Sequence, residues 1–110
     1  MNDKEAYIYK ILDICVEECT FDLSEATNVK AEDILSKCKR ENVVMTRCIF
    51  VTMMRFMGYS KTTAAAVLGR TEQAVTDILN VAHDYRKTSW AYRVAEAKCT
   101  LRIEPIKALY

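Results

Sequence analysis

Glycine and proline are unusually scarce in this sequence, with only two glycines and one proline among 110 residues. Tight turns between β-strands depend on these residue types, because glycine supplies positive φ angles and proline presets a bend. A chain so poor in both has little material for a β-meander. The scarcity therefore predicts an all-α fold.

The composition is that of a folded domain, with 51% hydrophobic and 28% charged residues. Residues 1–110 have the usual size of one domain, so we expect a single compact unit. There is no uncharged apolar run of about 18 residues and no basic leader, which predicts a cytoplasmic protein without a membrane span. The five cysteines form an odd set without a Cys-x-x-Cys pair, so we expect reduced thiols.

Charge is distributed unevenly along the chain. The first 35 residues carry a formal charge of −6, and the remaining 75 carry +7. Such polarity is typical of a domain that presents a nucleic-acid-binding face, although lopsided solvated surfaces are also common. The charge pattern alone leaves both interpretations open.

Apolar residues recur at helical spacing over most of the chain. We predict five to six helices in a compact bundle, and a loop from Thr20 to Lys30 in which Leu23 to Ala26 can form one turn of helix. Pro105 is expected to break the last helix. The expected helices are Asp3 to Cys19, Ala31 to Lys37, Asn42 to Met57, Lys61 to Leu68, Thr71 to Lys87 and Trp90 to Ile103.

The segment from Ser60 onward has the features of a helix-turn-helix. Ser60 and Thr71 can cap two helices, and Gly69 can make the tight turn between them. The small side chain of Ala65 would let the helices cross closely, and the inward apolar positions are Ala64, Leu68, Val75 and Ile78. The alternative is an ordinary helical hairpin in a bundle.

A DNA-binding helix-turn-helix places the first turn of its second helix at base edges in the major groove. Gln73 can then pair with adenine, Glu72 can accept from cytosine, and Thr76 can reach a base or phosphate. Carboxylates near phosphates are repelled, so Glu72 and Asp77 also motivate a protein-interaction module as an alternative. The exposed positions expected at this face are Thr71, Glu72, Gln73, Thr76, Asp77 and Asn80.

Contacts to the DNA backbone are expected from basic side chains and from a helix N-terminus. The amide groups that follow Ser60 form such a terminus. The candidate backbone-contacting residues are Lys37, Lys39, Arg40, Arg47, Ser60, Lys61, Thr62 and Arg70.

These segments resemble the C-terminal DNA-binding domain of the bacterial replication initiator DnaA, whose fold is similar to that of the Trp repressor. The resemblance rests on Val29-Lys30-Ala31-Glu32-Asp33-Ile34-Leu35-Ser36-Lys37, on Arg47, on Gly58 through Val75 and on the long helix that follows. It extends over about residues 6 to 101.

The resemblance implies a basic loop in the minor groove at Lys37, Lys39, Arg40 and Arg47, and a reading helix in the major groove. Arg70 matches the arginine of the family's Gly-Gly-Arg-Asp-His-Thr-Thr signature, whereas Gly69-Arg70-Thr71-Glu72-Gln73-Ala74 lacks the rest. It implies a stand-alone relative, acting in replication initiation or transcription regulation, with a different DNA target.

No catalytic role or cofactor is indicated. The chain has no Gly-x-x-x-x-Gly-Lys-Ser/Thr loop, so nothing suggests ATP use, and no nucleophile-base-acid set is visible. Cys15 and Cys19 share a helix face and are interpreted as core residues rather than metal ligands. We expect His83 to be a partly buried helix residue.

The aromatic residues Tyr85, Trp90 and Tyr92 are expected to pack between the last two helices, although a dimer contact would use the same residue types. The expected partner is double-stranded DNA, with a protein partner or a homodimer as the further possibility and no membrane. We therefore expect a DNA-binding protein that is not an enzyme.

Overall fold

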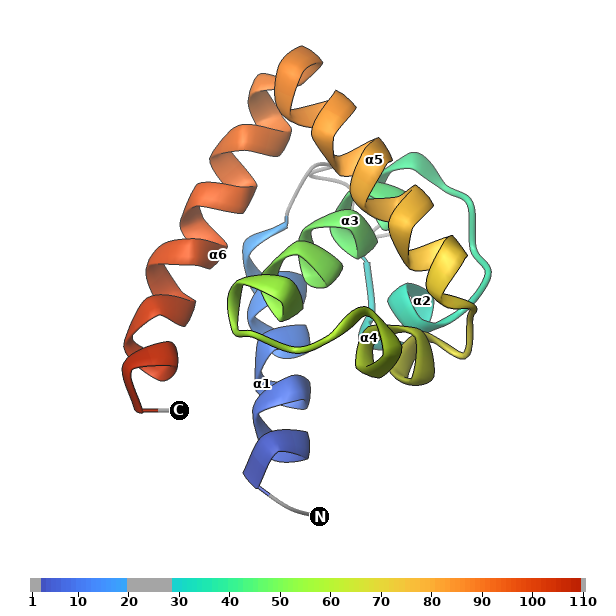
Figure 1. Ribbon diagram of the computed structural model, residues 1–110. Helices are drawn as coiled ribbons and strands as arrows, with labels where there is room; N and C mark the ends of the chain where they lie inside the picture. Colours follow the sequence, from blue (N-terminus) through green and yellow to red (C-terminus); the bar gives the residue numbers. More distant parts are fainter. Residues whose placement is uncertain (1–2, 20–28, 110) are drawn as a thin grey trace.

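The protein is all-α, as the sequence predicts. A computed structural model describes residues 3–19 and 29–109, and these residues form six helices without a strand (Figure 1). None of these helices is long and apolar enough to cross a membrane. The helices are α1 (Asp3–Glu18), α2 (Ala31–Leu35), α3 (Glu41–Phe56), α4 (Lys61–Leu68), α5 (Glu72–Thr88) and α6 (Trp90–Leu109).

Helix α3 is the centre of the fold, and all five other helices pack against it. Its residues Val43, Ile49, Phe50, Val51 and Met54 are fully buried. A helix that is apolar around most of its circumference can only be stable when neighbours cover it on every side. The prediction that this segment forms a buried central helix is confirmed.

The predicted helix boundaries around α4 and α5 are confirmed by their caps. The Ser60 hydroxyl accepts a hydrogen bond from the Thr63 amide, and the Thr71 hydroxyl accepts one from the Ala74 amide, both at 3.1 Å. Gly69 ends α4 at φ 62° and ψ 39°, and Gly58 follows α3 at φ 95°. Both glycines thus adopt the left-handed backbone that only glycine enters at little cost.

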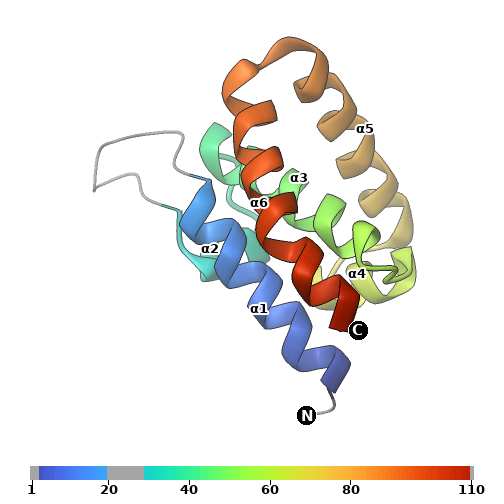
Figure 2. The ribbon, with the colours of Figure 1, turned by 90° about the vertical axis from the view of Figure 1, so that its left-hand side faces the viewer.

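Helices α1 and α6 lie side by side and close one side of the core (Figure 2). The Sγ atoms of Cys19 and Cys99 are 4.0 Å apart in the interior between them. At the surface, Arg102 donates to Glu17 at 2.6 Å and to Glu18 at 3.1 Å. The acidic end of α1 is therefore fastened to the middle of α6.

The buried cysteines are core residues, as expected. The hydrogen bond to Cys99 and burial raise the pKa of the Cys15 and Cys19 thiols, which keeps both protonated. Within residues 3–19 and 29–109, no three His, Cys, Asp or Glu side chains are placed to hold a metal ion.

Two predicted helix ends are wrong. The short helix ends at Leu35 rather than Lys37. Helix α6 does not end near Ile103 but continues through Pro105 to Leu109. Proline removes one hydrogen bond to the preceding turn, but Ile106 is buried and the Lys107 Nζ lies 4.2 Å from the centre of the Phe56 ring. These contacts hold the last turn of α6 against α3.

Two side chains lie differently from the expectation. His83 is exposed on α5 rather than partly buried. Tyr85 and Tyr92 stack at 5.4 Å between α5 and α6 as expected, but Trp90 is 72% exposed and takes no part in that packing. The expected turn of helix at 23–26 lies outside the described residues.

Candidate nucleic-acid interface

Helices α4 and α5 are joined by the three residues Gly69, Arg70 and Thr71, and we call these two helices with their connection the α4–turn–α5 unit. Ala64, Ala65, Leu68 and Val75 are buried, so this unit is fixed to the core through the residues that the sequence predicts for that role. Ile78 is half-buried and packs against the same core. The small side chains of α4 allow the close helix approach that the three-residue turn requires.

Arg70 joins this turn to the segment after α2. Its Nη2 atom donates to the Ser36 carbonyl oxygen at 2.9 Å, across 34 residues of sequence. The exposed residues Lys37, Lys39 and Arg40 follow Ser36 directly. We call residues 36–40 the basic segment. The contact places the basic segment beside the turn, so Arg70 and the cations of the basic segment are spatial neighbours.

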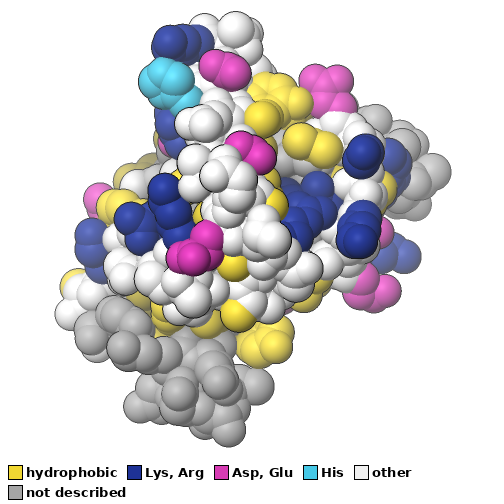
Figure 3. All heavy atoms as spheres, turned by 45° about the vertical axis from the view of Figure 1, so that its right-hand side comes forward, with side chains coloured by type: hydrophobic (Ala, Val, Ile, Leu, Met, Phe, Trp, Pro, Cys, Tyr) yellow, Lys and Arg dark blue, Asp and Glu magenta, His cyan; other side chains and the backbone are white. Residues whose placement is uncertain are grey.

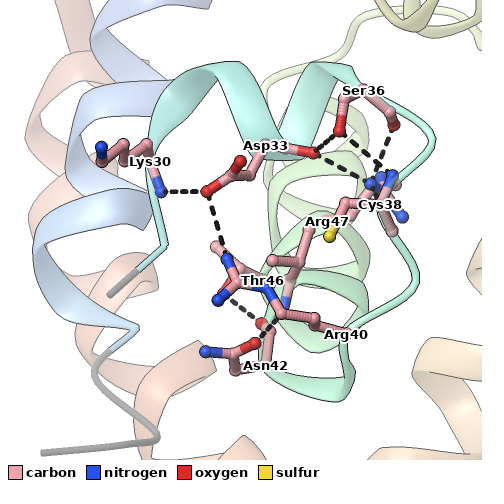
Figure 4. A network of polar contacts seen from close by, with 9 residues as sticks. Lys30, Asp33, Ser36, Cys38, Arg40, Asn42, Thr46 and Arg47 are labelled. Atoms are coloured by element: carbon pink, nitrogen blue, oxygen red, sulfur yellow. Dashed lines mark hydrogen bonds and ion pairs between the residues drawn. The ribbon is translucent and has the colours of Figure 1, made fainter. Parts of the chain in front are cut away.

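Arg47 does not reach the surface, and its assignment to the DNA backbone is wrong. Only 5% of the residue is exposed. Its guanidinium donates to four backbone carbonyls, those of Ile34 at 2.8 Å, Ser36 at 2.9 Å, Cys38 at 3.0 Å and Asp33 at 3.1 Å. Figure 4 shows Arg47 among Asp33, Ser36 and Cys38. Burial, followed by the positive charge of Arg70, lowers its pKa. Arg47 is therefore a structural residue that satisfies the carbonyl groups at the end of α2.

Asp33 organises the beginning of the same region (Figure 4). One of its carboxylate oxygens accepts from the Lys30 amide at 3.1 Å and from Arg40 Nη2 at 3.4 Å. The ion pair is largely solvated, since the side chains of Arg40 and Asp33 are 42% and 30% exposed. Such a pair is weak, so Arg40 can exchange it for a contact with an external anion.

The first turn of α5 carries the residues expected to face bases. Thr71, Glu72, Gln73 and Asp77 are exposed, while Thr76 is half-buried. The Thr62 hydroxyl donates to Glu72 at 2.6 Å, and the Gln73 amide donates to Asp77 at 3.1 Å. Both carboxylates are therefore already hydrogen-bonded within the protein.

Lys61 lies against the same turn. Its Nζ donates to the Thr76 hydroxyl at 3.2 Å, and that hydroxyl also donates to the Glu72 carbonyl at 3.3 Å. A cation thus stands beside the acidic start of α5.

Figure 3 shows the face that carries the start of α5 and the basic segment. Lys and Arg side chains lie on it in separate groups, and Asp and Glu side chains lie between and beside them. The surface is mixed rather than uniformly basic. Its cations flank the exposed polar surface of α5 instead of covering it.

Sequence reasoning missed Ser36, whose carbonyl oxygen accepts from both Arg47 and Arg70. A backbone carbonyl leaves no mark in the sequence. The inward position of Arg47 did have a signal, because this residue stands among apolar residues on nearly all sides of one helix.

No protein-family model, curated protein or solved structure matches this chain.

Proposed function

We propose that this protein binds double-stranded DNA through the α4–turn–α5 unit, with the first turn of α5 in the major groove as in a helix-turn-helix. The observation that carries the proposal is the 2.9 Å contact between Arg70 and the Ser36 carbonyl. It fixes the turn and the basic segment as neighbours, so that both can engage one duplex.

Phosphate contacts are assigned to Lys37, Lys39, Arg40 and Arg70, with Lys61 and the α4 N-terminus at Ser60 and Thr62 as a second group. Lysine and arginine side chains and helix N-termini supply most protein contacts to DNA phosphates. Arg47 is left out, because its guanidinium is occupied by carbonyl groups. These contacts would position α5 without reading sequence.

Base readout is assigned to Thr71, Gln73 and Thr76, with Glu72 able to accept from a cytosine amino group. The hydrogen bonds that Glu72 and Gln73 make in the free protein are exposed. Exposed hydrogen bonds contribute little net stability, so they can be exchanged for contacts with bases.

The proposal is tested by measuring the affinity for a labelled duplex across a salt series. Each neutralised phosphate contributes about −0.9 to the slope of log K against log salt. With four main phosphate contacts we expect a slope of log K against log salt of about −4. An absence of duplex binding at low salt would overturn the proposal.

Charge-reversal variants locate the surface. Lys39→Glu and Arg70→Glu should each weaken binding to all duplexes and reduce the salt slope by about one. Lys10→Glu is the matched control, since Lys10 is an exposed lysine on α1. Equal effects at Lys10 and Lys39 would mean that binding is a property of net charge alone.

A protein-interaction module is the second candidate, and the exposed carboxylates of Glu72 and Asp77 on α5 are the observation that favours it. A protein partner with a basic surface would pair with them. Under this alternative neither the natural chain nor the double variant Glu72→Gln, Asp77→Asn binds duplex DNA at low salt. Under the main proposal both bind, and the variant binds more tightly.

The biological role, in replication initiation or in transcription regulation, depends on the target sequence. A selection from randomised duplexes at controlled salt identifies that target sequence. Enrichment of one motif, lost on Gln73→Ala, would support base readout by α5.

A further inference from the structure

Helix α6 is apolar on two opposite faces. Its buried face consists of Tyr92, Ala95, Cys99, Ile103 and Ile106. At about 100° per residue, Trp90, Leu101 and Ala108 lie within about 20° of the line directly opposite Cys99. Helices at a protein surface usually carry charged and polar residues on that outer side. The outward face of α6 is therefore unlike that of an ordinary surface helix.

The outer stripe of α6 is defined here as Trp90, Val94, Ala97, Leu101 and Ala108. Trp90 is 72% exposed and Leu101 is 70% exposed. The described residues include five exposed large hydrophobic side chains, and three of these, Trp90, Leu101 and Leu109, belong to α6. The helix lies at one edge of the molecule (Figure 1), and four of the five stripe residues are exposed, while Val94 is half-buried.

We propose that a second copy of this chain covers the outer stripe, with two α6 helices packed antiparallel about a twofold axis. Spacings of four and three residues separate Trp90, Val94, Ala97 and Leu101. This alternation is the spacing that lets two helices pack along a common seam.

Side-chain size favours the antiparallel arrangement. With the axis between Lys98 and Cys99, near the midpoint of α6, almost the whole helix overlaps its copy. Trp90 then lies beside Ala108 of the partner subunit, and Leu101 lies beside Ala97 of the partner subunit. Each large side chain meets a small one, which is the condition for close packing without voids.

Charge favours the same register. Arg93 and Glu104 are exposed and flank the outer stripe on the same side. Antiparallel packing sets Arg93 opposite Glu104 of the partner subunit, and the twofold axis generates this pair twice. Parallel packing would instead set Glu104 opposite apolar residues of the other edge.

The interface is small. A helix of 20 residues is about 30 Å long, and one helix pair lies at the low end of stable interfaces. We therefore expect a weak dimer that forms as concentration rises. Helix α6 and the α4–turn–α5 connection occupy opposite edges of the molecule (Figure 1), so dimerisation leaves the proposed DNA-binding surface free.

The full chain tests this directly. Trp90 is the only tryptophan, so its fluorescence reports on the stripe alone. As the protein concentration is raised, sedimentation equilibrium should show the 12.6 kDa chain converting to a species of twice that mass. The Trp90 emission should shift to the blue over the same range of protein concentration. The DNA-binding result does not affect this outcome.

Variants identify the face and its register. Leu101→Glu should abolish the mass increase and the blue shift, and Trp90→Ala should weaken association at least about tenfold, because each substitution acts twice in a symmetric dimer. Val81→Glu is the matched control, since Val81 is an exposed apolar residue of α5. Arg93→Glu should weaken the dimer, and the further change Glu104→Arg should restore it.

A chain that stays monomeric at the highest soluble concentration overturns the proposal. A dimer that forms equally well in Leu101→Glu also overturns it, because that dimer uses another surface. Capture of a different protein by the stripe of a purely monomeric chain would assign the face to that partner instead. Failure of the double charge swap to restore association would exclude the antiparallel register.

Discussion

The Thr62 hydroxyl donates a hydrogen bond to the Glu72 carboxylate at 2.6 Å, which joins the first turn of α4 to the first turn of α5. Glu72 is exposed, and its negative charge stands where the proposed DNA would approach. The free protein thus holds this carboxylate through a neutral donor, without cancelling its charge.

Glu72→Gln should therefore increase the affinity for duplexes of random sequence, where Glu72 has no cytosine partner, by about fivefold at low salt, since two charges near 4 Å interact by about 1 kcal/mol in water. The Thr62 hydroxyl can still donate to the carbonyl oxygen of the amide that this substitution introduces. Fluorescence anisotropy of a labelled duplex measures the change. Asp13→Asn on α1 is the control, and an equal gain there would attribute the effect to net charge.

Arg47→Met should destabilise the fold by about 3 kcal/mol, because four carbonyl groups lose a shared donor in a buried site. Urea denaturation followed by circular dichroism measures this loss. Arg40→Met is the comparison, since its ion pair with Asp33 is exposed and contributes less than about 1 kcal/mol. A loss of stability that is equal in the two variants would contradict the structural role of Arg47.

Gly69→Ala should cost about 1 kcal/mol of stability, because the left-handed backbone is strained for a residue with a Cβ. The backbone of Gly69 has φ 62°, and a Cβ at this position would meet nothing within 4 Å, so the cost comes from backbone strain alone. Gly69→Asn should cost less, because asparagine tolerates the left-handed region. Thermal denaturation distinguishes them, and a smaller loss for alanine than for asparagine would refute the strain argument.

Cys38 should be the first thiol to be alkylated. Hydrogen bonds from the backbone and side chain of Arg40 lower its pKa, which increases the reactive thiolate near neutral pH. The other four cysteines are buried, and burial raises the pKa of Cys48 to about 12. Mass spectrometry after brief iodoacetamide treatment should find one modified site. Arg40→Ala should slow the reaction, and a rate that stays unchanged would count against the role of Arg40.

Pro105→Ala should stabilise the protein by about 1 kcal/mol, because alanine is the better helix former and restores the amide that can donate to the Leu101 carbonyl. Proline restricts the unfolded chain, which offsets part of the gain. Chemical denaturation measures the difference. A clear loss of stability would show that Pro105 contributes packing that its exposed position does not indicate.

Helix caps and turn glycines determine the backbone locally, and where the sequence contains them it predicted the helix ends well. The caps at Ser60 and Thr71 and the positive φ at Gly69 place α4 and α5 within a residue of the expected ends. The end of α6 could not be predicted from Pro105, because tertiary contacts of Ile106 and Lys107 outweigh one missing hydrogen bond.

The candidate interface was less predictable. Sequence spacing indicated Lys37, Lys39, Arg40 and Arg70, but only the fold shows that Arg70 reaches Ser36. The charge of Arg47 suggested a surface role, whereas burial beside four carbonyls gives it another. The charge of a residue alone therefore does not assign it to the surface, and the apolar neighbours of Arg47 along its helix were the better signal.

The carbonyl oxygen of Ser36 accepts from Arg47 in the interior and from Arg70 at the surface. Because the buried Arg47 holds this oxygen still, the half-buried Arg70 is ordered before any ligand arrives. Less side-chain entropy is then lost on association, which is the advantage of preorganisation. Substitutions at Arg47 that leave the chain folded should consequently act at a distance, lowering affinity through faster dissociation.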